Sequence, residues 1–153
     1  MARLFGTDGV RGVANESLTC ELAVKIGQAA AAVLGGNQKK DPLLLWDMDT
    51  RISSDMLAGA ISAGLCSSGA DVLSLGVIPT PAVAYLVRKY HADAGVVISA
   101  SHNSAEFNGI KIFSANGYKL PDELEEKIED MILGDQKIHG DIIGSRCGQN
   151  NSC

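Results

Sequence analysis

The sequence lacks several features that would place it in well-known classes of protein. It has no run of about 20 apolar residues, the length that a membrane-spanning helix needs. It does not begin with a basic region followed by a long apolar run, so a secretory signal is not expected. Basic residues are in the minority, with 13 Lys and Arg against 18 Asp and Glu and a net charge of −5. A negative chain offers little attraction to nucleic acid or to an anionic membrane, and we expect neither as a partner.

Cysteine is also scarce, and it is not arranged for metal binding or redox chemistry. The chain has four cysteines, and no two of them stand in a Cys-x-x-Cys spacing. A domain of this length can bury an adequate core without disulfide bonds, so we expect free thiols and a reducing, cytoplasmic location. A bond between Cys147 and Cys153 is the alternative, and no other feature of the sequence supports it.

What the sequence does contain is the pattern of one α/β domain. Its 153 residues are 46% hydrophobic, which suits a single folded core. Apolar periodicity and terminal signals predict helices over residues 19–34, 53–66, 81–90 and 121–133, the second of them capped by Ser53. Short apolar runs predict buried strands over residues 43–46, 72–75, 94–99 and 110–113. The pair Asn116-Gly117 predicts a hairpin turn.

The alternation of strands and helices predicts the fold class. It implies an α/β protein, a layered α/β/α domain with a mixed, largely parallel sheet. We assign residues 1–142 to this domain. Residues 143–153 are polar and have no apolar periodicity, so we expect a disordered tail or a linker there.

Three polar segments are candidates for a functional site, because ligands of open parallel sheets gather beyond the carboxyl ends of strands. They are residues 6–12, 47–53 and 99–109. The third directly follows the most apolar predicted strand, a suitable place for a positioned nucleophile. Ser101 and His102 are neighbours there, but a triad needs a base that meets the hydroxyl in space and a third group that orients it. The Gly-x-Ser-x-Gly elbow of α/β hydrolases is also missing, so the residues alone leave a structural serine and a serine hydrolase open.

Three motifs occur in order, at residues 5–12 (FGTDGVRG), at 49–53 (DTRIS), and at 98–103 (ISASHN) with 108–111 (NGIK). They resemble the opening signature, the second motif and the phosphoserine loop of the α-D-phosphohexomutase superfamily, and within it they are most similar to the phosphoglucosamine mutases. The resemblance covers residues 3–120, the first of the family's four domains. Two departures lie in loops. The family usually has Gly after the second motif, where this chain has Ser54, and often has Pro where it has Ser104.

The resemblance implies a phosphosugar mutase. In this family a phosphoserine gives its phosphoryl group to a sugar monophosphate, the bisphosphate turns over in the site, and the other phosphate returns to the serine. Ser101 matches that serine. Arg11 and Lys111 match cations that stabilise the phosphate, and His102 suits proton transfer because an imidazole titrates near neutral pH. The residues expected to bind substrate or phosphate are Ser99, Asn103, Thr7 and Asn108.

The resemblance also bears on metal binding. Asp47 and Asp49 are close enough in sequence to suggest a site for a hard cation. However, the family match makes Asp49 part of an Asp-Thr-Arg turn, and we expect a salt bridge to Arg51 instead. The family's single Mg²⁺ is held by an aspartate-rich loop of the second domain and by an oxygen of the phosphate on the serine, here Ser101. This chain has no such loop, so we expect no turnover by the chain alone.

Other functions stay open alongside this one. A phosphomannomutase or phosphoglucomutase domain is the second choice, since the loop that reads the sugar lies outside the chain. A folded module without catalysis is the choice from another class. The face that would pack on a second domain would be exposed in an isolated chain, so we expect that it can self-associate. For each of the mutases the partner is a small phosphosugar.

Overall fold

The fold is built on one six-stranded sheet. The computed structural model describes residues 3–35, 42–134 and 147–152. Its strands are β1 (Val10–Val13), β2 (Leu43–Met48), β3 (Asp71–Val77), β4 (Ala94–Ile98), β5 (Phe107–Ser114) and β6 (Asn150–Ser152). Their order across the sheet is β1-β5-β4-β2-β3-β6. Strands β4, β2, β3 and β6 run parallel, whereas β5 is antiparallel to both β4 and β1. The prediction of a mixed, largely parallel sheet is confirmed.

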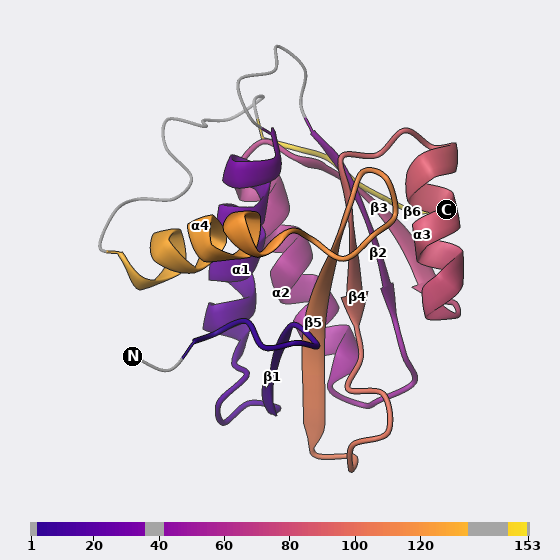
Figure 1. The fold of residues 1–153 in the computed structure, drawn as a ribbon. Helices are drawn as coiled ribbons and strands as arrows, with labels where there is room; N and C mark the ends of the chain where they lie inside the picture. The colour runs from indigo at the N-terminus through magenta and orange to yellow at the C-terminus, as the bar shows by residue number, and fades with distance from the viewer. Residues whose placement is uncertain (1–2, 36–41, 135–146, 153) are drawn as a thin grey trace.

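Helices cover both faces of this sheet. They are α1 (Cys20–Gly35), α2 (Ser54–Ser67), α3 (Thr80–Lys89) and α4 (Asp122–Leu133). Helices α1, α2 and α4 pack on one face, and α3 packs on the other (Figure 1). Residues of β2 alternate between the two cores, so that Leu44 and Trp46 belong to the larger one and Leu45 to the one under α3. This is the predicted α/β/α layering.

Most predicted elements are confirmed, and the differences lie in the shortest strands. The Asn116-Gly117 turn is closed by a bond from the Gly117 amide to the carbonyl of Ser114. Strand β1 overlaps the polar segment of residues 6–12, where no strand was predicted. Strand β6 lies in the stretch expected to be a tail or linker, where residues 150–152 pair in parallel with residues 72–74 of β3. All three β6 residues are exposed, so backbone pairing rather than apolar burial forms this strand.

Three further expectations concern membrane-spanning helices, the cysteines and the domain boundary. No helix in the described part of the chain is long and apolar enough to cross a membrane. Cys20, Cys66 and Cys147 are free thiols, as expected, and Cys153 lies outside the described residues. The predicted domain boundary near residue 142 also lies outside them.

Candidate active site

The candidate site lies at the carboxyl ends of β2 and β4, where the three polar segments meet. The two strands are parallel neighbours with Met48 opposite Ile98, so the loops that follow them leave the sheet at the same edge. The amide of Asp49 donates to the carbonyl of Ile98 at 3.0 Å. The segment that contains Arg11 joins them through β1, in which Arg11 lies opposite Gly109 of β5. The structure thus brings the three polar segments to one edge of the sheet.

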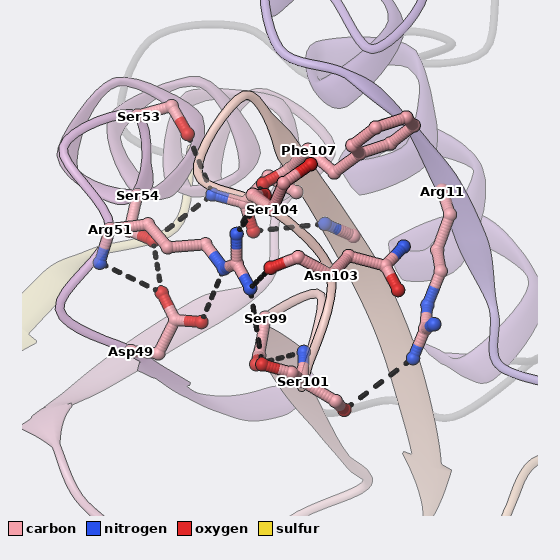
Figure 2. A network of polar contacts seen from close by, with 12 residues as sticks. Arg11, Asp49, Arg51, Ser53, Ser54, Ser99, Ser101, Asn103, Ser104 and Phe107 are labelled. Carbon is pink, nitrogen blue, oxygen red and sulfur yellow. Dashed lines mark hydrogen bonds and ion pairs between the residues drawn. The ribbon is translucent and has the colours of Figure 1, made fainter.

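Ser101 is presented as a fixed, exposed hydroxyl. It lies in the loop between β4 and β5 and has a left-handed backbone with φ of 54°, which is unfavourable for a residue other than glycine. Its amide donates to Oγ of Ser99 at 3.0 Å, and the amide of Asn103 donates to the carbonyl of Ala100 at 3.1 Å. Its Oγ accepts a hydrogen bond of 3.4 Å from a terminal nitrogen of Arg11 (Figure 2). The loop therefore aims the serine oxygen at a cation.

Arg51 holds this loop from the side opposite Arg11 (Figure 2). Its Nε donates to Oδ2 of Asp49 at 3.0 Å, which confirms the predicted salt bridge. Its terminal nitrogens donate to four carbonyl oxygens of the loop, those of Ser101 (3.1 Å), Asn103 (2.7 Å), Ser104 (2.6 Å) and Phe107 (3.0 Å). Every N–H of the guanidinium thus has an acceptor. This role of Arg51 was not predicted from the sequence.

Asp49 is the anion that orients Arg51. Burial raises the pKa of its carboxyl, but hydrogen bonds from the Arg51 backbone and from Ser54, Ser99 and the Arg51 side chain outweigh burial and lower it. The carboxyl accepts from the Arg51 amide at 3.0 Å and from Oγ of Ser54 at 2.8 Å. A carboxylate with a lowered pKa stays ionised at neutral pH, so the pair keeps both its charges.

Asn108 corrects one of our expectations. It was predicted to bind substrate or phosphate, but it is completely buried. Its amide nitrogen donates to Oγ of Ser53 at 2.9 Å and of Ser54 at 3.1 Å, and its oxygen accepts from the amide of Gly109. Ser53 directly precedes α2, but its side chain makes no capping bond, so the predicted cap is wrong. Ser54, in the place of the usual glycine, joins Asn108 to Asp49. Asn108 therefore supports the residues of the site from the protein interior and does not face a ligand.

Arg11 and Lys111 lie on the face of the sheet opposite the larger core. Ile110 and Ile112 flank Lys111 in β5 and point into that core, so Lys111 points away from it. Arg11 crosses β5 at Gly109. A Cβ on Gly109 would lie 3.0 Å from Cγ of Arg11 and closer still to the backbone of Ser99, just after β4, so only glycine leaves room for this crossing. The crossing brings Arg11 to Ser101, while Lys111 lies two positions further along β5, opposite Val97 of β4.

Asp8 is a site residue that the sequence-based predictions missed. Its Oδ1 lies 3.7 Å from Nζ of Lys111, and its Oδ2 lies 3.8 Å from a terminal nitrogen of Arg11. The signal that could have found it is an acidic residue between two glycines, three positions before a predicted phosphate-binding arginine.

The roles of the other predicted residues stay predictions. Thr7 is exposed and lines a cavity of about 180 Å³ together with Asp8 and Lys111. Asn103 is exposed, and His102 is exposed beside Ser101. Ser99 contributes an oxygen that accepts the Ser101 amide.

A second, larger cavity opens in front of the loop. It measures about 600 Å³, within the usual range of small-molecule sites. Its lining residues are Asp49, Thr50, Arg51, Ile52, Ser99, Ser101, Asn103 and Ala105. The hydroxyl of Ser101 thus borders a space that a small ligand can enter.

Comparison with known proteins decides the family. Residues 2–139 match the family described as phosphoglucomutase/phosphomannomutase, alpha/beta/alpha domain I. The chain belongs to this family. The sequence-based resemblance is thereby confirmed.

Relatives within this phosphohexomutase family are close in sequence. The chain is 61% identical over 156 residues to phosphoglucosamine mutase of Ruminiclostridium cellulolyticum, in an alignment that covers 99% of this chain and 35% of the relative. It is 64% identical over 150 residues to phosphoglucosamine mutase of Acetivibrio thermocellus, with coverage of 95% and 33%. A solved structure from Thermus thermophilus, assigned as a putative phosphomannomutase, matches with a TM-score of 0.82 and 28% identity over 99% of this chain and 33% of that one. The chain therefore spans about a third of the length of these relatives.

The described residues of this phosphohexomutase domain do not fit a Mg²⁺ site of their own. Among them, no group of three or more His, Cys, Asp or Glu side chains could hold a metal ion. Asp49 borders the same cavity as Ser101, but Arg51 and Ser54 engage both its oxygens. Asp47 is buried in β2, and burial raises the pKa of its carboxyl to about 7. The two aspartates that suggested a cation site are therefore unsuited to form one.

Proposed function

We propose that this domain carries the phosphoserine of a phosphosugar mutase that interconverts glucosamine 6-phosphate and glucosamine 1-phosphate. The observation that carries the proposal is the geometry at Ser101. An exposed serine oxygen is held on a rigid loop, 3.4 Å from a terminal nitrogen of Arg11 and beside a cavity of about 600 Å³. Membership of the family supports the reaction class, and the relatives named phosphoglucosamine mutase support the choice of sugar.

The proposed step is the transfer of a phosphoryl group from Ser101 to a hydroxyl of the sugar monophosphate. The sugar oxygen bonds to phosphorus, the bond from phosphorus to Oγ of Ser101 breaks, and the hydroxyl proton ends on Oγ. The bisphosphate then turns over, and the reverse step at its other phosphate restores the phosphoserine. Such a transfer needs mainly positioning and charge neutralisation from the protein. Arg11 and Lys111 supply positive charge, and the loop held by Arg51 supplies positioning.

Further parts of the proposal concern the complete polypeptide. The Mg²⁺ that such transfers use would be held mainly by carboxylates outside the described residues, and Ser101 would contribute only through its phosphate. We also propose a phosphosugar as the partner, a cytoplasmic location, and self-association of the isolated chain. The second candidate reaction is that of a phosphomannomutase, which the assignment of the Thermus thermophilus structure favours.

Mass spectrometry of the complete polypeptide tests the proposal. Intact-mass and fragmentation spectra should place one phosphate on Ser101. Ser101→Ala should remove it, and Ser104→Ala, as the control, should leave it in place, because alanine keeps the main-chain carbonyl that Arg51 binds. A phosphate on Ser99 or Ser104 with Ser101 bare would contradict the assignment. A coupled assay then separates the two reactions, because turnover of mannose 6-phosphate above that of glucosamine 6-phosphate would favour the second.

A further inference from the structure

Asp8 lies at the tip of a tight turn whose backbone packs closely against β5. The turn is closed by two backbone bonds, from the Gly6 amide to the Gly9 carbonyl at 2.9 Å and from the Gly9 amide to the Gly6 carbonyl at 3.2 Å. Gly9 has φ of 83°, and a Cβ there would overlap the carbonyl of Ile110. This close approach fixes the turn directly beside Lys111, the next residue of β5. The position of Asp8 is therefore set by the backbone and by glycine.

The carboxylate of Asp8 is shared by the two cations of the site. One oxygen faces Lys111 and the other faces Arg11, at 3.7 and 3.8 Å. These distances are too long for strong hydrogen bonds, so the contacts are loose ion pairs. The side chain of Asp8 is 56% exposed, whereas those of Arg11 and Lys111 are 26% exposed. An exposed anion held loosely between two more deeply placed cations can be displaced by a competing anion.

We propose that Asp8 is the displaceable counter-ion of the phosphate-binding cations. Without a phosphate, its carboxylate neutralises part of the charge of Arg11 and Lys111. A phosphoryl group that approaches these cations must compete with the carboxylate and is repelled by it, so it is bound less tightly. The inference rests on the proposed function, in which a bisphosphate must leave these cations in order to turn over. A weaker hold on phosphate serves that turnover.

Two observations favour this role over a purely structural one. The turn is closed by backbone bonds and by Gly9, and neither needs a carboxylate. The other carboxylate on the cavity of about 180 Å³ is Glu125, which is buried and paired with Lys119 at 3.2 Å and with Arg3 at 3.7 Å. Of the two acidic side chains that line this cavity, Asp8 is therefore the one that pairs with Arg11 and Lys111.

The test uses the 153-residue chain and inorganic phosphate as the probe, at low ionic strength because salt screens exposed charges. Backbone amide shifts of Ser101 and Gly9 report binding. Asp8→Asn should tighten phosphate binding about three- to tenfold, the range expected from two partly exposed ion pairs. Asp8→Ser, which also removes the charge, should act in the same direction. Asp130→Asn changes the net charge equally at an exposed position of α4 and should leave the affinity unchanged.

The outcomes separate this inference from the proposed function. Unchanged or weaker binding by both Asp8 variants overturns the counter-ion role, and so does equal tightening by Asp130→Asn. A merely damaged turn would weaken binding, which is the opposite sign. Arg11→Gln and Lys111→Gln should weaken binding, and failure of both to do so overturns the phosphate site itself. In the complete enzyme, Asp8→Asn should lower KM and kcat together, because phosphate is held too tightly. An unchanged KM there also overturns the inference.

Discussion

Replacing Arg51 by alanine should free the loop that carries Ser101. The change removes the ion pair to Asp49 and all four hydrogen bonds to the loop carbonyls. The carbonyl of Ser104 would keep its other bond, from the amide of Phe107 at 3.1 Å, so the loop would lose most but not all of this support. Ser101 would then lose the support that keeps its backbone left-handed, and its hydroxyl would no longer be held in front of Arg11.

The magnitude follows from how exposed each contact is. The bonds to Asp49 and to the carbonyl of Phe107 are partly buried, and hydrogen bonds to a charged group contribute about 1.5–3 kcal/mol each. The three remaining bonds are exposed and add less. We therefore expect Arg51→Ala to lower the free energy of unfolding by about 3–5 kcal/mol. Arg51→Lys should lose about half of that, because an ammonium cannot reproduce the planar fork of a guanidinium.

Urea unfolding and amide hydrogen exchange measure the effect. The urea midpoint should fall without a change of slope, and exchange should speed up most at residues 99–108. Arg88→Ala is the matched control, since Arg88 is an exposed arginine at the end of α3. It should change stability by less than about 0.5 kcal/mol. If Arg51→Ala behaved like Arg88→Ala and exchange in the loop were unchanged, the guanidinium would not be what orders the loop.

Three other sites lend themselves to the same kind of test. Burial raises the pKa of Asp47 to about 7. Between about pH 4 and pH 7 the folded chain therefore keeps a proton on this carboxyl that the unfolded chain has released, so the free energy of unfolding should fall as the pH rises through that range. Asp47→Asn should flatten that fall and add about 1–3 kcal/mol at pH 8, and an unchanged pH profile of the urea midpoint would contradict this. Gly109→Ala should lower the free energy of unfolding by about 1–3 kcal/mol, because its Cβ would overlap Arg11 and Ser99. Gly59→Ala in α2 has open space around it and should stabilise the chain. Equal effects of the two changes on the urea midpoint would show that the crossing of Arg11 over β5 does not require glycine at position 109. In the complete enzyme, Lys111→Ala should lower kcat on the order of 10²-fold and raise KM by a smaller factor, and a kcat within a few-fold of the wild type would leave Lys111 with a structural role only.

The layered fold could be predicted because its signals are local. Each helix carries an apolar face at helical spacing, and the central strands are apolar runs. Strand β6 gave no such signal, because its three exposed residues are held by hydrogen bonds to a strand far away in the sequence. The same holds for β1, whose four residues follow glycine-rich sequence and are defined by their pairing with β5. Short edge strands depend on their partners more than on their own side chains.

The residues of the candidate site could be predicted better than the contacts between them. Ser101, Arg11 and Lys111 were predicted from the resemblance of their motifs to the family. Only Ser101 lies in a loop after a parallel strand, whereas Arg11 and Lys111 lie in the antiparallel strands β1 and β5. The error at Asn108 came from treating a polar residue as a ligand-facing one. Asn108 alternates with Ile110 and Ile112 along β5, and that register could have shown that it faces the core. The salt bridge from Arg51 to Asp49 was predicted, but the bonds from Arg51 to the loop carbonyls could not be, since they depend on the path of the loop backbone.

The terminal nitrogens of Arg51 bind only main-chain oxygens of the loop, and this determines how the sequence of the loop can vary. A carbonyl oxygen is present whatever the side chain, so these four contacts do not depend on which residues occupy positions 101, 103, 104 and 107. Ser104 illustrates this, because it replaces the proline common in the family and still offers its carbonyl to Arg51. The shape of the loop is in this sense insensitive to its own composition. The side chains around Ser101 can therefore diverge while the serine stays in place.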